Sequence, residues 1–134
     1  MSLFESCICV AIIAGIGFFA APSIVKARDN YQLDLVTRQV AGNTQWTRMK
    51  AISRSRDCRI RVVSTTTYTM ECQDPIWAAD QTVALPQGFQ ISANATPQFY
   101  KRGNAAPAAT LTISDKHSHT KQVVINITGR VRVQ

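Results

Sequence analysis

The feature that most constrains this chain is an apolar run near its N-terminus. From Ser6 to Val25 no side chain is ionisable apart from the thiols of Cys7 and Cys9. A helix of about 20 such residues is long enough to cross the hydrocarbon core of a bilayer. The run follows directly after one carboxylate, Glu5, and a charge at the edge of hydrocarbon is costly unless it has a partner. The sequence therefore predicts a membrane-spanning helix and raises the question of what Glu5 pairs with.

The charges around this run distinguish an anchor from a cleavable signal. A secretory signal peptide begins with basic residues and has a shorter apolar core, whereas this run begins with an acid. Lys26 and Arg28 follow the run, and by the positive-inside rule they would hold the rest of the chain in the cytoplasm. A disulfide, argued below, requires an oxidising compartment instead. The two observations agree only if a basic leader has been removed from in front of Met1, and the alternative is that Met1 is the initiator residue.

Beyond Pro22 the helical pattern continues with one apolar face. Weakly polar or apolar residues recur every three or four positions, namely Leu33, Val36, Val40, Thr44, Thr47 and Ala51. Charged residues are expected largely on the other faces, namely Asp29, Asp34, Arg38, Arg48 and Lys50. The pattern predicts one helix of about 50 residues, apolar all round in its first half and amphipathic in its second. Proline removes a backbone hydrogen bond, so we expect a kink or loosening at Pro22.

From Arg59 onward the sequence alternates with period two and is rich in Val, Ile and Thr. Candidate strands cover 59–64, 67–73, 81–85, 89–93, 110–114, 122–127 and 130–133. An antiparallel sheet needs an apolar cover, which the amphipathic half of the helix supplies. The predicted fold class is α+β, a long N-terminal helix packed on a small antiparallel β-sheet domain. Its parts are an apolar helix (1–27), an amphipathic helix (28–56) and a β-rich domain (57–134).

Cys58 and Cys72 lie in two stretches that are typical of neighbouring strands in a hairpin. A disulfide between them would close a loop of about 15 residues, worth roughly 3 kcal/mol in the chain-entropy model. Two buried free thiols are the alternative. A metal site is not expected, because no second Cys or His lies at ligand spacing beside either one. Cys7 and Cys9 are interpreted as small apolar residues of the membrane helix.

The same residues carry a family resemblance. The segment "SLFESCICVAIIAGIGFFAAPSI" resembles the start of mature type IV pilins and type II secretion pseudopilins, with a glutamate at position five and a proline at position twenty-two. "VALPQGFQIS", "ATLTISD" and "VVINITGRVRV" resemble the GspH/FimT family of minor pilins and pseudopilins. Met1, Ser2 and Phe4 differ from the commoner residues of these families. The resemblance implies a pilin-like fold, leader cleavage by a prepilin peptidase and methylation of the new amine at Met1.

The resemblance also implies a partner for Glu5. In such filaments each apolar helix leaves the membrane and packs among its neighbours' helices, and Glu5 approaches the N-terminal amine of an adjacent subunit. Removing one partner of a buried ion pair typically costs about 3 to 5 kcal/mol, so the pairing would fix the register of assembly. Gly15, Gly17 and Pro22 bracket the part of the helix that related filaments unwind. Close helix packing through small residues is a second, compatible interpretation.

The C-terminal residues "TGRVRVQ" predict a second site. On a strand, Arg130 and Arg132 would project from one exposed face about 7 Å apart, with Val131 and Val133 turned to the core. In the FimT branch a Gly-Arg-x-Arg ending is associated with DNA binding during uptake, and Gly129, Arg130 and Arg132 match it.

Other basic residues bear on this second site. Lys121, and Lys101 with Arg102 if their loop folds back, would extend it. The alternative is that the arginines only discourage edge-to-edge strand pairing, and Arg59 and Arg61 form a second pair of the same kind. The excess of 15 Lys and Arg over 8 Asp and Glu is compatible with a polyanion partner and with general surface charge.

No other chemistry is expected. His117 and His119 have no third ligand in view, so no metal or cofactor is predicted. No nucleophile elbow or phosphate loop is present, so an enzyme is not expected. The favoured function is a subunit of a type IV pilus-like filament that polymerises with other pilin or pseudopilin subunits, with DNA binding for natural transformation as an added hypothesis. It would lie in the bacterial inner membrane before assembly and in a periplasmic or extracellular filament afterwards. The alternatives are a minor pseudopilin at the tip of a type II secretion machine and a membrane-anchored protein that forms no filament.

Overall fold

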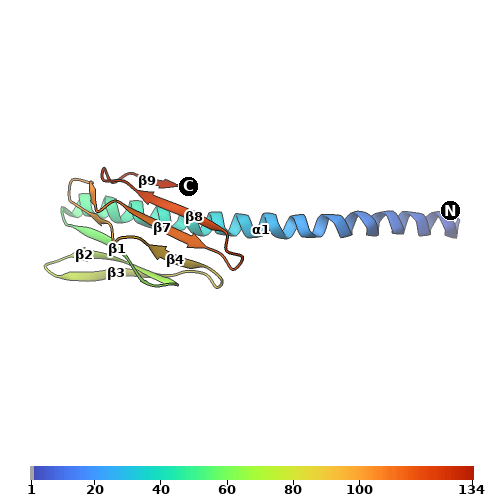
Figure 1. The fold of residues 1–134 in the computed structure, drawn as a ribbon, viewed down its shortest axis with the longest axis horizontal. Coiled ribbons are helices and arrows are strands. Elements are labelled where there is room, and N and C mark those ends of the chain that lie inside the picture. Colours follow the sequence, from blue (N-terminus) through green and yellow to red (C-terminus); the bar gives the residue numbers. More distant parts are fainter. Residues whose placement is uncertain (1) are drawn as a thin grey trace. The chain divides into compact units, whose positions relative to one another are not determined.

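A computed structural model describes residues 2–134 of the chain. One helix, α1 (Leu3–Arg54), is followed by strands β1 (Cys58–Ser64), β2 (Thr67–Gln73), β3 (Trp77–Ala84), β4 (Gln90–Ala93), β5 (Gln98–Phe99), β6 (Ala105–Ala106), β7 (Ala109–Ser114), β8 (Thr120–Ile125) and β9 (Val131–Val133) (Figure 1). Two compact units make up the chain, one ending at Gln32 and the other covering Leu33–Gln134. The predicted α+β class, with a long N-terminal helix and antiparallel sheets, is confirmed.

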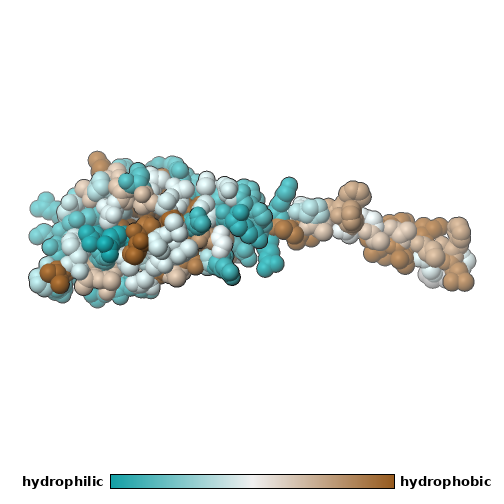
Figure 2. Space-filling view, turned by 60° about the horizontal axis from the view of Figure 1, so that its bottom comes forward, coloured by the Kyte–Doolittle hydropathy of each residue, from teal (hydrophilic) through white to brown (hydrophobic). Residues whose placement is uncertain are grey.

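The first unit is the apolar part of α1. By length and composition this helix can cross a membrane, with a mean hydropathy of 2.4 over its most apolar window. Its large side chains are exposed, among them Phe18 and Phe19 at 82% each, and Figure 2 shows the thin apolar segment that they form. The α-helix passes through Pro22 without a break. The loosening expected there is therefore not seen in the isolated subunit, and unwinding in a filament stays a prediction.

In the second unit α1 buries the face that the sequence predicts. All six positions of the predicted apolar face are buried, and Val40, Thr44 and Ala51 have no exposed surface. The threonines fit there because their hydroxyls donate to carbonyl oxygens four residues earlier, as Thr44 does to Val40 at 2.8 Å. Lys50 is the exception to the prediction. It was expected on an outer face but is buried, with an exposed fraction of 8%.

Two antiparallel sheets pack with this helix face. The first has the order β3-β2-β1-β5-β6 and the second β4-β7-β8-β9. The core between them and the helix contains large side chains such as Tyr68, Phe99 and Leu111, all with no exposed surface. β3 begins at Trp77, earlier than predicted, because Trp77 pairs with Gln73 at the end of β2. β5 and β6 were not predicted, since two-residue strands carry no detectable alternation.

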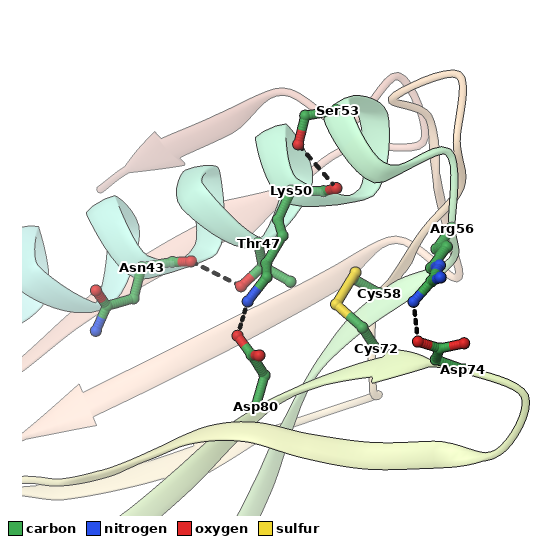
Figure 3. The surroundings of a disulfide bond; sticks show 9 residues. All are labelled: Asn43, Thr47, Lys50, Ser53, Arg56, Cys58, Cys72, Asp74 and Asp80. Atoms are coloured by element: carbon green, nitrogen blue, oxygen red, sulfur yellow. Dashed lines mark hydrogen bonds and ion pairs between the residues drawn. A yellow bond between two sulfur atoms is a disulfide. The ribbon is translucent and has the colours of Figure 1, made fainter.

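The predicted disulfide is formed. Cys58 and Cys72 are directly opposite each other in the β1–β2 ladder, with Cα atoms 4.0 Å apart. Figure 3 shows two ion pairs around it, Lys50 with Asp80 and Arg56 with Asp74. The first of these explains why Lys50 is buried, because Asp80 on β3 neutralises its ammonium group. The disulfide thus joins β1 to β2, the Lys50–Asp80 pair joins α1 to β3, and the Arg56–Asp74 pair joins the segments that follow α1 and β2.

Candidate assembly helix and basic surface

Glu5 lies in the first turn of α1, with an exposed side chain. A carboxylate in this position is stabilised by the partial positive charge of the helix N-terminus. The backbone N–H of Glu5 donates to the carbonyl oxygen of Ser2 at 3.0 Å. The family resemblance implies that Glu5 pairs with the N-terminal amine of Met1 in an adjacent subunit. Met1 lies outside the described residues. Pairing of Glu5 between subunits therefore stays a prediction.

Gly15 and Gly17 have open space beside them among the described residues. No described atom lies within 4 Å of a Cβ atom added at either position, apart from the backbone and chain neighbours of the helix itself. Glycine in a helix interior costs about 0.8 to 1 kcal/mol relative to alanine. No packing contact among the described residues explains that cost, which is consistent with a requirement imposed by neighbouring helices or by local unwinding.

Gly129, the first residue of the Gly-Arg-x-Arg sequence, makes a close backbone contact. Gly129 has a φ of +77°, and a Cβ atom there would lie 1.9 Å from the carbonyl oxygen of Gly103. That same oxygen accepts a hydrogen bond from Nε of Arg48 at 2.7 Å. Nearby, the N–H of Ala105 donates to the carbonyl oxygen of Ile127 at 2.9 Å. The loop that contains Lys101 and Arg102 therefore folds back onto the C-terminal segment.

This contact gathers basic residues from three parts of the chain. Arg48 comes from α1, Lys101 and Arg102 precede Gly103 in the loop, and Arg130 follows Gly129. We call these four residues and Arg132 the basic cluster. Lys101, Arg102, Arg130 and Arg132 are exposed, and Arg48 is half-buried. Arg48 and Gly103 were not found from the sequence, because nothing in their local pattern shows that they meet Gly129.

Lys121 is not part of the basic cluster. It lies on β8 on the same face as Val123 and Ile125, which are buried in the core. Its Nζ is 2.6 Å from Oδ1 of Asp34 on α1. Arg132 is opposite Val124, on the other face of that sheet. The alternation of side chains along β8 therefore separates Lys121 from Arg132.

The valines of β9 behave differently from each other. Val131 packs against the core, as predicted. Val133 was expected to face the core but is 39% exposed. The reason is that β9 is the last strand of its sheet, and the core does not extend to its end.

The second arginine pair serves the fold. Arg59 and Arg61 both bind the carboxylate of Glu71, at 2.6 Å and 3.0 Å, and Glu71 is only 4% exposed. The guanidinium of Arg59 also lies 4.2 Å from the ring centroid of Trp77. A buried carboxylate needs such partners, so these arginines are part of sheet packing.

His117 and His119 lie in the turn between β7 and β8, which is organised around Asp115. Oδ1 of Asp115 accepts hydrogen bonds from the backbone N–H groups of His117 and His119, and Oδ2 lies 3.0 Å from Nδ1 of His119. Burial alone would raise the pKa of Asp115, but these hydrogen bonds hold it below its usual range. Asp115 thus organises the turn between β7 and β8, where Ser118 has a φ of 63°.

Comparisons with known proteins assign this architecture. The family model described as "Type II transport protein GspH" matches residues 36–129, so the chain belongs to the GspH family. The minor pseudopilin EpsH from the type 2 secretion system of Vibrio cholerae is similar in structure, with a TM-score of 0.67, 17% identity, and coverage of 77% of this chain and 96% of EpsH. The type IV minor pilin FimU of Pseudomonas aeruginosa has a TM-score of 0.65 at 14% identity, covering 79% of this chain and 90% of FimU. Sequence comparison with curated proteins gives no significant match.

Proposed function

We propose that this chain is a subunit of a pilus-like filament and polymerises through the apolar part of α1. Membership of the GspH family supports a filament subunit. The observation that carries the proposal is the exposed apolar surface from Leu3 to Val25, which needs a cover of lipid or of neighbouring helices. A single-pass anchor alone would give no reason for a carboxylate at Glu5 or for glycines at Gly15 and Gly17.

The pairing of Glu5 with the N-terminal amine of a neighbour is the step to test. We expect Glu5→Ala to insert into membranes normally and to fail in assembly, because the neighbour's amine would be buried without a partner at a cost of about 3 to 5 kcal/mol. Sedimentation of sheared filaments, with membrane fractionation in parallel, measures both properties. Asp29→Ala, in the polar part of α1, is the matched control. A normal filament yield from Glu5→Ala would refute the proposal.

Two kinds of filament are equally compatible with these findings. EpsH is a minor pseudopilin of a secretion system and FimU is a minor pilin of a type IV pilus. The chain resembles both to a similar extent. Identifying which filament contains the chain, by labelling it in cells that carry only one of the two machines, decides between them.

A second candidate function is polyanion binding by the basic cluster, with DNA as the test ligand. The observation in its favour is the Gly103–Gly129 contact, which places cations from α1, the loop and the C-terminal segment around one point. Phosphate contacts release counterions, so binding should be non-specific and strongly salt-dependent.

The fragment 28–134, which contains the whole second unit, should shift duplex DNA in a gel. Arg130→Ala with Arg132→Ala should remove most of that shift and lower the slope of log K against log salt by about 2. Lys121→Ala is the control and should leave the shift unchanged, because Lys121 lies on the other face and binds Asp34. An unchanged shift in the double variant would assign the basic cluster to another role.

A further inference from the structure

A cavity of about 460 Å³ lies where three turns of the second unit meet. One wall is the turn between β7 and β8, and the opposite wall is the chain that enters β4, at the same end of the second unit (Figure 1). Thr66, in the turn between β1 and β2, completes the lining. The volume is within the range of about 300 to 1,000 Å³ that is typical of small-molecule sites. No residue of the cavity belongs to the apolar part of α1 or to the basic cluster.

Five side chains that line the cavity have unused hydrogen-bonding groups. Among the described residues these side chains form no hydrogen bond or ion pair, namely Gln90, Ser114, Lys116, Ser118 and Thr120. Four of the five are hydroxyls or an amide, which both donate and accept hydrogen bonds, and the ammonium group donates. An apolar ligand would leave these groups without partners. The lining therefore fits a ligand that carries several groups able both to donate and to accept.

The charges that line the cavity balance each other. Lys116 and Asp115 are the charged residues among those that line it. The side chain of Asp115 is only 5% exposed, and its oxygens are taken up by the backbone N–H groups of His117 and His119 and by the ring of His119. This carboxylate fixes the turn and so holds the neighbouring polar side chains in place. A phosphate group would need further cations, so the lining favours a neutral ligand.

Ser118 has an unfavourable backbone conformation in this wall. Its φ is 63°, in the left-handed region that glycine and asparagine adopt more readily than serine. Its side chain is exposed, and no contact among the described residues requires a hydroxyl there. A residue kept in such a conformation for its side chain points to a ligand. We propose that the cavity binds a neutral saccharide, whose hydroxyls both donate to and accept from the five side chains.

The test uses the full chain in micelles of a detergent without a sugar headgroup, so it does not depend on filament assembly. The probes are two neutral disaccharides, maltose and diacetylchitobiose, and backbone amide signals are followed by NMR. At least one sugar should shift the signals of residues 88–90 and 114–120 saturably and leave those of the basic cluster unchanged. Glycerol at an equal hydroxyl concentration should give no saturable shift. No saturable shift in the cavity with either sugar, or an equal response to inorganic phosphate, would overturn the proposal.

Two glycine variants separate binding from folding. Ser118→Gly removes a hydroxyl where glycine is favoured, so it should leave the urea midpoint unchanged or higher and weaken sugar binding about three- to tenfold. Ser92→Gly removes an exposed hydroxyl from β4 outside the cavity, so it should lower the urea midpoint and leave binding unchanged. Unchanged binding in Ser118→Gly would overturn the proposal. A lower urea midpoint in that variant would show that the hydroxyl serves the fold, and would also overturn it.

Discussion

Replacing Gly129 by alanine tests how the basic cluster is built. The substitution adds a Cβ atom 1.9 Å from the carbonyl oxygen of Gly103 and 2.7 Å from Nε of Arg48. The φ of +77° is also unfavourable for alanine, by about 1 to 2 kcal/mol. Relieving the overlap requires Gly103 to move away from Arg48, which weakens a hydrogen bond from a charged donor by about 1.5 to 3 kcal/mol. We expect a total loss of about 2.5 to 5 kcal/mol in the free energy of unfolding.

Gly88 is the matched control for this prediction. It has a φ of +92°, but the nearest atom to an added Cβ is Cβ of Lys116 at 4.0 Å. Gly88→Ala therefore carries the conformational cost alone, about 1 to 2 kcal/mol. Urea unfolding of the fragment 28–134, with the disulfide intact, measures both variants. Equal destabilisation of the two variants would refute the close contact of Gly129 with Gly103.

Further predictions concern the links around the disulfide. Replacing both Cys58 and Cys72 by alanine should lower the free energy of unfolding by about 3 kcal/mol in the same urea assay, and an effect below about 1 kcal/mol would contradict a stabilising bridge. Lys50→Met should cost about 1 to 3 kcal/mol, because it leaves the carboxylate of Asp80 without its partner. Adding Asp80→Ala should recover part of that loss if the two groups interact, whereas simply additive losses would show that they do not.

Sequence reasoning succeeded where periodicity carries the information. The apolar face of α1 from Leu33 to Ala51 follows from steps of three and four, and every position expected there is buried. The β1–β2 hairpin follows from period-two alternation, and with it the proximity of Cys58 and Cys72. These are local patterns, and one buried face of each element was enough to specify them.

The sequence failed where contacts join distant segments. The helical pattern predicts that Lys50 faces solvent. Its burial is explained by its ion pair with Asp80 on β3, which is distant in sequence. The sequence predicts Lys121 as part of the basic surface. In the structure Lys121 lies on the face of β8 that packs against α1, where it binds Asp34. The hydrogen bond from Arg48 to the carbonyl oxygen of Gly103 joins residues 55 positions apart. No local sequence pattern predicts it.

We propose that Glu5 is neutralised by the N-terminal amine of an adjacent subunit. A cryo-electron microscopy map of filaments containing this chain, at a resolution that shows side chains, would reveal this pair. We expect the Glu5 carboxylate within about 4 Å of a neighbour's terminal nitrogen. A carboxylate that faces lipid or solvent, with no cationic group near it, would refute the pairing.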